Sequence, residues 1–126
     1  LHLSIRRQRQ MCIRDRTMKH PDMFGYAGVF SGFVGPFNKT NAENSYIQLL
    51  DDREKFTQSF RVFFRACGDE DLVALERFEA DRALFEEKGL APAENSIHVE
   101  KMYPGEHEWN VWRMCLRDFA QYLFHE

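Results

Sequence analysis

Two short polar segments contain side chains suited to acid–base catalysis. The first, at 67–71, reads CGDED, and the second, at 104–109, reads PGEHEW. A histidine can take up and return a proton near neutral pH, and a carboxylate bonded to its ring fixes the tautomer and stabilises the charged form. The candidate base is His107, and the candidate acids are Asp71 and Asp69. This chemistry is typical of hydrolases in which histidine activates a nucleophile.

Each of these residues also has a structural role open to it. Asp71 is a suitable N-cap for a helix beginning near Leu72, and a turn from strand to helix can serve both purposes. His107 alternatively caps a helix or lies on the surface. We expect Trp109 to pack against the core as part of a helix face, and the alternative is that it lines a substrate pocket, since it follows His107 closely.

Spacing disfavours two other chemistries. His107-Glu108 begins like the zinc motif H-E-x-x-H, but position 111 is Val, and no Cys and His pair has zinc-ligand spacing. Ser31 follows a predicted strand but lacks the G-x-S-x-G pattern, so we do not expect it to be a nucleophile. The sequence therefore predicts neither a metal nor a cofactor.

Alternating strands and helices must position the two polar segments. Each segment directly follows a predicted strand, and strands that alternate with helices pair in parallel through crossovers. The carboxyl ends of parallel strands meet at one edge of the sheet, so the two segments should lie close together. The predicted strands are 24–31, 60–67 and 97–103, and the predicted helices are 72–88 and 108–124, with 44–58 partly helical. The apolar faces of the two main helices comprise Leu75, Phe78, residues 82–83 and Phe85, and then Trp112, Cys115, Leu116, Phe119 and Leu123.

Three segments together resemble a family of α/β-hydrolases. They are HPDMFGYAGVFSG from His20, the CG-x-x-D of 67–71, and PGEHEWNVW from Pro104. Their order and spacing are similar to those of the group that includes enterochelin esterases, feruloyl and acetyl-xylan esterases of carbohydrate-esterase family one, S-formylglutathione hydrolases and mycolyltransferases. The resemblance extends from about Met18 to the end of the chain. The family often has Gly-Gly-His where this chain has Gly105-Glu106-His107.

The resemblance implies the C-terminal part of an α/β-hydrolase domain, here residues 17–126. It places the triad acid on Asp71 and the general base on His107. The family's nucleophilic serine and its oxyanion donors would lie upstream of His20. The implied function is that of a carboxylic ester hydrolase acting on a small-molecule or carbohydrate-linked ester, and we expect the chain without the serine to be nearly inactive. A non-catalytic binding domain and an acyltransferase of the same fold are the alternatives.

Residues 1–16 differ in character from the rest of the chain. Back-translation of Arg6 to Asp15 gives a string that resembles a transposase-type sequencing adapter, so we interpret 1–16 as translated adapter sequence. These residues contain five arginines and one aspartate, which leaves twelve basic and nineteen acidic side chains elsewhere, a formal charge of about −7. An acidic domain of this kind is not expected to bind nucleic acid.

Hydropathy and cysteine content further limit the class of protein that this sequence predicts. No segment is long and apolar enough to predict a membrane span. Outside 1–16 there are two cysteines, too few for a disulfide framework, which slightly favours a cytoplasmic location. Oligomeric state is not predicted.

Overall fold

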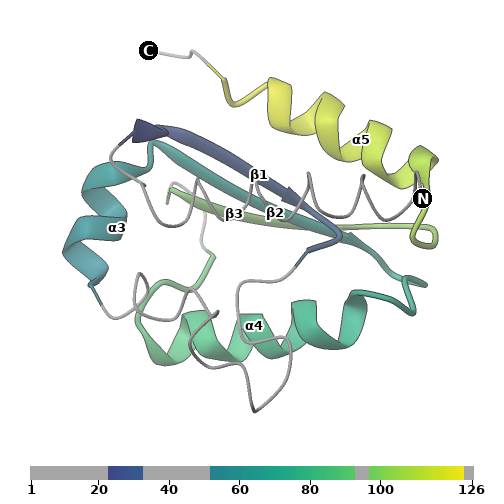
Figure 1. Cartoon of the computed structure of the whole chain (residues 1–126), viewed down its shortest axis with the longest axis horizontal. Helices are drawn as coiled ribbons and strands as arrows, with labels where there is room; N and C mark the ends of the chain where they lie inside the picture. Colours follow the sequence, from purple (N-terminus) through teal and green to yellow (C-terminus); the bar gives the residue numbers. More distant parts are fainter. Residues whose placement is uncertain (1–22, 33–51, 93–96, 124–126) are drawn as a thin grey trace, which may run out of the picture.

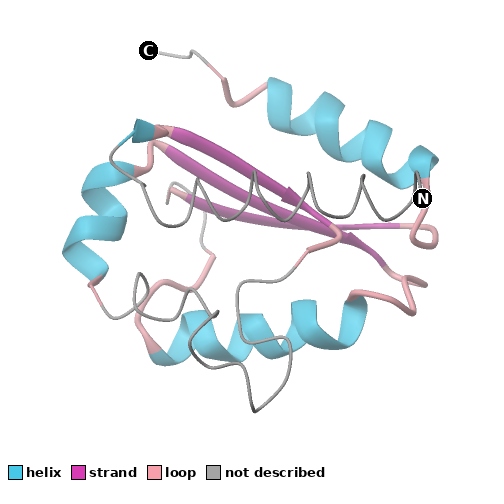
Figure 2. Cartoon of the chain, in the orientation of Figure 1, coloured by secondary structure: helices cyan, strands magenta, loops and turns pink. Residues whose placement is uncertain are grey.

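A three-stranded parallel sheet forms the centre of the molecule. The structure is a computed structural model and describes residues 23–32, 52–92 and 97–123. Within them, strands β1 (Tyr26–Phe30), β2 (Val62–Gly68) and β3 (His98–Tyr103) pair in the order β1-β2-β3, all parallel. Helices α3 (Arg53–Ser59), α4 (Leu75–Glu87) and α5 (Trp109–Ala120) alternate with the strands (Figure 2). The predicted α/β fold with parallel strands is therefore confirmed.

Helices cover both faces of the sheet. Figure 1 shows α5 on one face and α3 with α4 on the other. Strand β2 is central, and its side chains alternate between the two layers. Phe63 packs in the cluster that includes Phe56 of α3 and Phe85 of α4. Its neighbour Phe64 packs on the opposite face with Val111 and Cys115 of α5, and burial on both faces is why this strand has no polar stripe.

Aromatic side chains fill the layer between the sheet and α3. The ring centroids of Phe56 lie 5.1 Å from Phe60, 5.2 Å from Phe63 and 6.2 Å from Phe85, all edge to face. Offset and edge-on packing is the arrangement that aromatic quadrupoles favour. The predicted partly helical stretch 44–58 is represented here by α3 alone, because 44–51 lies outside the described residues.

The apolar faces of two helices differ from those predicted. Leu116 was expected in the core but is 56% exposed, whereas Val111 is fully buried. The row of α5 that contacts the sheet runs from Val111 through Cys115, which turns Leu116 toward solvent. In α4 the buried row includes Asp81, while Ala83 is exposed. Asp81 is buried because a charge in the sheet lies opposite it.

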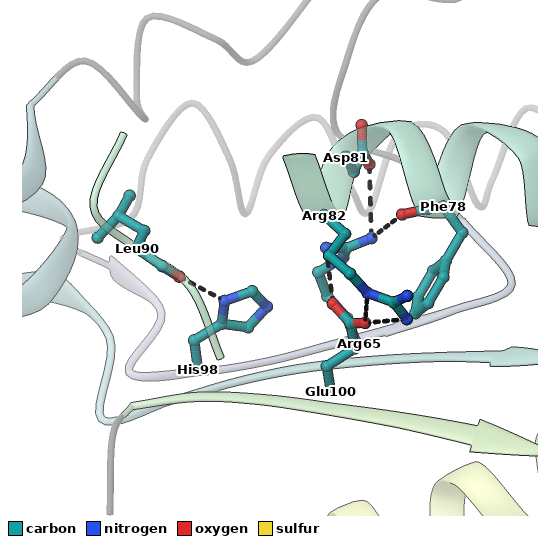
Figure 3. Close-up of polar contacts among 7 residues, drawn as sticks. All are labelled: Arg65, Phe78, Asp81, Arg82, Leu90, His98 and Glu100. Carbon is teal, nitrogen blue, oxygen red and sulfur yellow. Dashed lines mark hydrogen bonds and ion pairs between the residues drawn. The ribbon is translucent and has the colours of Figure 1, made fainter. Parts of the chain in front are cut away.

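That charge is the guanidinium of Arg65 on β2, which is fully buried under α4 (Figure 3). Its Nη2 donates to the Phe78 carbonyl oxygen at 2.7 Å, and its Nη1 lies 3.3 Å from the Glu100 carboxylate. The Asp81 carboxylate is 3.9 Å away, and Arg82 also pairs with Glu100. Burial lowers the pKa of Arg65, and the two carboxylates oppose that effect. The arginine thus joins β2, β3 and α4 through polar contacts.

Candidate active site

Asp71 and His107 meet at the carboxyl edge of the sheet. Asp71 lies in the loop after β2 and His107 in the loop after β3, 36 residues later. The His107 Nδ1 is 2.8 Å from Asp71 Oδ2. The structure therefore brings together the two residues that the sequence suggested as acid and base.

The backbone of its own loop holds the Asp71 carboxylate. Oδ1 accepts hydrogen bonds from the amides of Val73 at 3.0 Å and Ala74 at 2.9 Å. These bonds cap a turn over 72–74, so α4 begins at Leu75 and not near Leu72 as expected. Asp71 combines the capping role and the contact with histidine because each uses a different oxygen.

Asp71 is fully buried yet remains the charged partner. Burial acts to raise its pKa, but hydrogen bonds from His107, the Ala74 amide and the Ser31 hydroxyl outweigh it and hold the pKa below the usual value. An ionised carboxylate only accepts hydrogen bonds, so Nδ1 of His107 must carry the proton. A neutral ring of this tautomer has its lone pair on Nε2, which is the arrangement a general base requires.

Asp69, the alternative acid, makes different contacts. Its carboxylate accepts a hydrogen bond from the Gly105 amide at 2.9 Å, and its own amide donates to the Tyr103 carbonyl oxygen at 2.8 Å. The Glu70 amide donates to the Gly105 carbonyl oxygen at 2.9 Å. Asp69 thus joins the two loops through backbone groups, whereas Asp71 contacts the histidine ring.

Glycine allows the two loops to approach this closely. A Cβ on Gly68 would overlap the Gly105 carbonyl oxygen and lie 2.9 Å from the Glu106 carbonyl oxygen. Gly105 has φ of 140°, and a Cβ there would be 2.7 Å from Val111 Cγ2. Gly68 therefore excludes a side chain because of contact alone, and Gly105 excludes one because of both contact and its positive φ.

The His107 side chain is partly exposed to solvent. It is 34% exposed, and the edge of Trp112 packs against it at a centroid distance of 5.1 Å. Trp109 is 67% exposed, so the interpretation of this residue as core is wrong; it lies at the surface beside Trp112, at 6.3 Å. Leu72, next to Asp71, is 98% exposed. Exposed apolar side chains therefore lie within two residues of each member of the Asp71–His107 pair along the chain.

Ser31 is the residue of this site that the sequence did not identify. It follows β1, has φ of 51° and is buried. Its Oγ accepts a hydrogen bond from Trp112 Nε1 at 3.0 Å, and its hydroxyl helps to lower the pKa of Asp71. Ser31 thus influences the acid of the pair. The only signal available in the sequence was its place after a strand, at the same edge as the two polar loops.

Other features of the described residues bear on the class of site. No group of three or more His, Cys, Asp or Glu side chains in 23–32, 52–92 and 97–123 is arranged to hold a metal ion. None of the helices in those ranges combines the length and apolar character needed to cross a bilayer. Cys67 and Cys115 are free and buried, and burial raises their pKa values to about 12 and about 11.

Comparisons with protein-family models and with curated proteins identify no relative of this chain. Models of known protein families do not match this chain, and a search of curated proteins finds no match to it. The small parallel α/β unit and its Asp71–His107 pair therefore carry the functional inference.

Proposed function

We propose that Asp71 and His107 are the acid and base of a carboxylic ester hydrolase that uses a serine nucleophile. The observation that carries the proposal is the 2.8 Å contact between His107 Nδ1 and a buried, backbone-bonded carboxylate. A carboxylate that only capped the turn before α4 would not need a histidine on its second oxygen. The exposed face of the ring supports access by a nucleophile and a substrate.

The proposed reaction follows from the tautomer. His107 Nε2 takes the proton of the serine hydroxyl as its oxygen bonds to the ester carbonyl carbon, and the imidazolium then gives that proton to the leaving alcohol. Asp71 stabilises the imidazolium between these steps. In the second half, His107 takes a proton from water as the water oxygen bonds to the acyl carbon. The bond from that carbon to the serine oxygen then breaks, and the imidazolium returns the proton to the serine oxygen, which releases the acid and the free serine.

The source of the serine is part of the proposal. The resemblance to enterochelin and carbohydrate esterases places it in a G-x-S-x-G-G turn upstream of His20. Among the described residues β1 pairs with β2 alone, and the proposal places a further parallel strand at its other edge. A turn at the carboxyl end of such a strand would come to the same edge as His107. Trp109, exposed near His107, is proposed to contact the organic part of the ester.

The test compares this chain with a longer protein that includes the natural upstream residues. We expect the longer protein to hydrolyse p-nitrophenyl acetate with a burst of p-nitrophenol, and the 126-residue chain to give none. In the longer protein, Asp71→Asn and His107→Ala should each lower kcat by a factor on the order of 10³–10⁶.

Two controls make the result decisive. Asp69→Asn changes the neighbouring carboxylate that contacts backbone and not the ring, so it should lower kcat far less than Asp71→Asn. Ser31→Gly in the 126-residue chain tests whether this chain contains its own nucleophile. A full burst from the short chain, or an active His107→Ala variant of the long one, would overturn the proposal.

The alternatives predict other products. An acyltransferase of the same fold would pass the acyl group to an added alcohol in preference to water, which product analysis distinguishes. A binding domain without catalysis would show no burst in either length of chain.

A further inference from the structure

Ser31 is unusual because it is a buried serine with a left-handed backbone. Its φ of 51° is uncommon for a residue with a Cβ, and glycine or asparagine would suit it better. Its amide donates to the Ala66 carbonyl oxygen at 2.7 Å, which extends the pairing of β1 with β2 by one residue. That pairing needs no hydroxyl, so the side chain must be explained by its own contacts.

The indole of Trp112 determines how the Ser31 hydroxyl is oriented. The Trp112 indole N–H can only donate, so it occupies a lone pair of Ser31 Oγ at 3.0 Å. The hydroxyl proton then remains available to an acceptor, and the ionised Asp71 carboxylate can only accept. In keeping with this orientation, the Ser31 hydroxyl helps to lower the pKa of Asp71.

Trp112 also contacts the other member of the pair. The rings of Trp112 and His107 meet edge to face at 5.1 Å. The Trp112 indole thus donates its N–H to the Ser31 hydroxyl and also packs against the His107 ring. It can do so because it lies on the first turn of α5, directly after the His107 loop, and faces the end of β1.

We infer that Ser31 and Trp112 are positioning residues that hold the Asp71 carboxylate and the His107 ring in their paired orientation. As support for catalysis this assignment rests on the proposed esterase function. Its geometric content concerns the hydrogen bonds of Asp71 and His107, which can be measured without a substrate. The backbone strain at Ser31 is then the cost of placing a hydroxyl beside Asp71.

The test is NMR spectroscopy of the 126-residue chain. The variants are Ser31→Gly, which removes the hydroxyl and suits the positive φ, and Trp112→Phe, which keeps a ring against His107 and removes the N–H. The readouts are the His107 Nδ1–H resonance, the His107 ring-nitrogen shifts that report the tautomer, and the titration midpoint of the Asp71 carboxyl.

We expect Ser31→Gly to fold with unchanged or higher stability and still to raise the Asp71 midpoint and weaken the Nδ1–H resonance through faster exchange with water. Trp112→Phe should change both readouts in the same direction and by less, because its Ser31 hydroxyl is free to turn. Trp109→Phe, on the same helix but exposed, is the matched control and should change neither.

A folded Ser31→Gly variant with the wild-type Asp71 midpoint and the wild-type His107 signals would overturn the inference. The same holds if Trp109→Phe alters those signals as much as Trp112→Phe does. If the NMR changes occur but the longer protein shows no ester hydrolysis, the proposed function is wrong and the positioning of the pair stands.

Discussion

At the scale of single residues, burial determines which side chains have shifted pKa values. His98, at the start of β3, shows this, and Figure 3 shows its ring bonded to the backbone of Leu90. Its Nδ1 donates to the Leu90 carbonyl oxygen at 2.7 Å, and its ring lies 4.4 Å from that of Phe85. Burial, with a smaller contribution from Arg65, lowers the pKa of His98 to about 4, although the bond to Leu90 acts in the other direction.

The His98 environment predicts a loss of stability in mild acid. The unfolded chain takes up a proton near the ordinary pKa of 6.5, whereas the folded chain resists it until about pH 4. Stability is therefore fully present above pH 6.5 and falls as the pH drops toward 4, by up to about 1.4 kcal/mol per unit and on the order of 3 kcal/mol in all. Urea unfolding at a series of pH values would measure this decline.

The matched variant for this prediction is His98→Gln, which cannot titrate in that range. Its free energy of unfolding should change less with pH between 6.5 and 4 than that of the wild type. Parallel curves for the two proteins would show that His98 is not the group responsible.

Asp71 shows how much residue-level reasoning predicted at the site. Its type and its place after a strand were enough to suggest both a cap and a catalytic acid. The choice between Asp69 and Asp71 needed coordinates, because both carboxylates belong to one turn and only its path shows which of them faces the histidine. Ser31 could not be identified for the same reason, since its partners lie 40 and 81 residues away along the chain.

At the scale of elements, the geometry of the candidate site depends more on the positions of its two loops than on those of the helices. The loop after β2 and the loop after β3 are joined by backbone bonds through Asp69, Glu70 and Gly105. Those bonds form only because Gly68 lets the Gly105 carbonyl come against its backbone. The contact of Asp71 with His107 depends on this approach, since each side chain is carried by one of the loops.

Gly68→Ala should therefore separate the loops. The added methyl group meets backbone carbonyls, which cannot move as a flexible side chain would, so we expect a loss of about 1–3 kcal/mol in the free energy of unfolding. The His107 Nδ1–H resonance should weaken in the same variant. Chemical denaturation and NMR spectroscopy provide the two measurements.

Gly25→Ala is the control for this prediction. The nearest atoms to a Cβ there are Arg61 Cγ at 3.9 Å and Cδ at 4.0 Å, an ordinary contact, so stability should change by no more than about 0.5 kcal/mol. Equal effects from the two substitutions would mean that contact with the Gly105 loop is not what constrains Gly68.

At the scale of the whole molecule, a buried charge links the layers on one side of the sheet. Arg65 is fully buried beneath α4 and stacks on the rings of Phe78 and Phe85, at 4.3 and 4.8 Å. Its ion pairs reach Glu100 on β3 and Asp81 on α4. The sequence predicted a strand at 60–67, and nothing in its pattern distinguishes Arg65 from an arginine facing solvent.

Arg65→Met should destabilise the molecule strongly. Removing one member of a buried ionic cluster leaves its partners without compensation, which costs about 3–5 kcal/mol. Arg82→Met is the matched control, because Arg82 pairs with the same Glu100 but its side chain is 42% exposed. That variant should lose no more than about 1 kcal/mol in urea denaturation. A loss from Arg82→Met as large as that from Arg65→Met would contradict the importance of burial.

The order of elements follows from the sequence alone. The spacing of apolar residues and the positions of turn-forming residues are local properties of the sequence. The alternation of strands and helices, the parallel pairing and the placement of Asp71 and His107 at one edge were therefore all predictable. The buried faces of the helices were less predictable, as Leu116 and Asp81 show. How a helix lies on the sheet determines which of its rows of side chains is buried.

Only the tertiary structure decided which polar groups share contacts. The partnership of Asp71 with His107, the junction of loops at Gly68, the hydroxyl of Ser31 and the burial of Arg65 all join residues far apart in the chain. Such contacts depend on distances between elements of a few tenths of an ångström, whereas hydropathy and turn signals place each element along the chain and not against its neighbours.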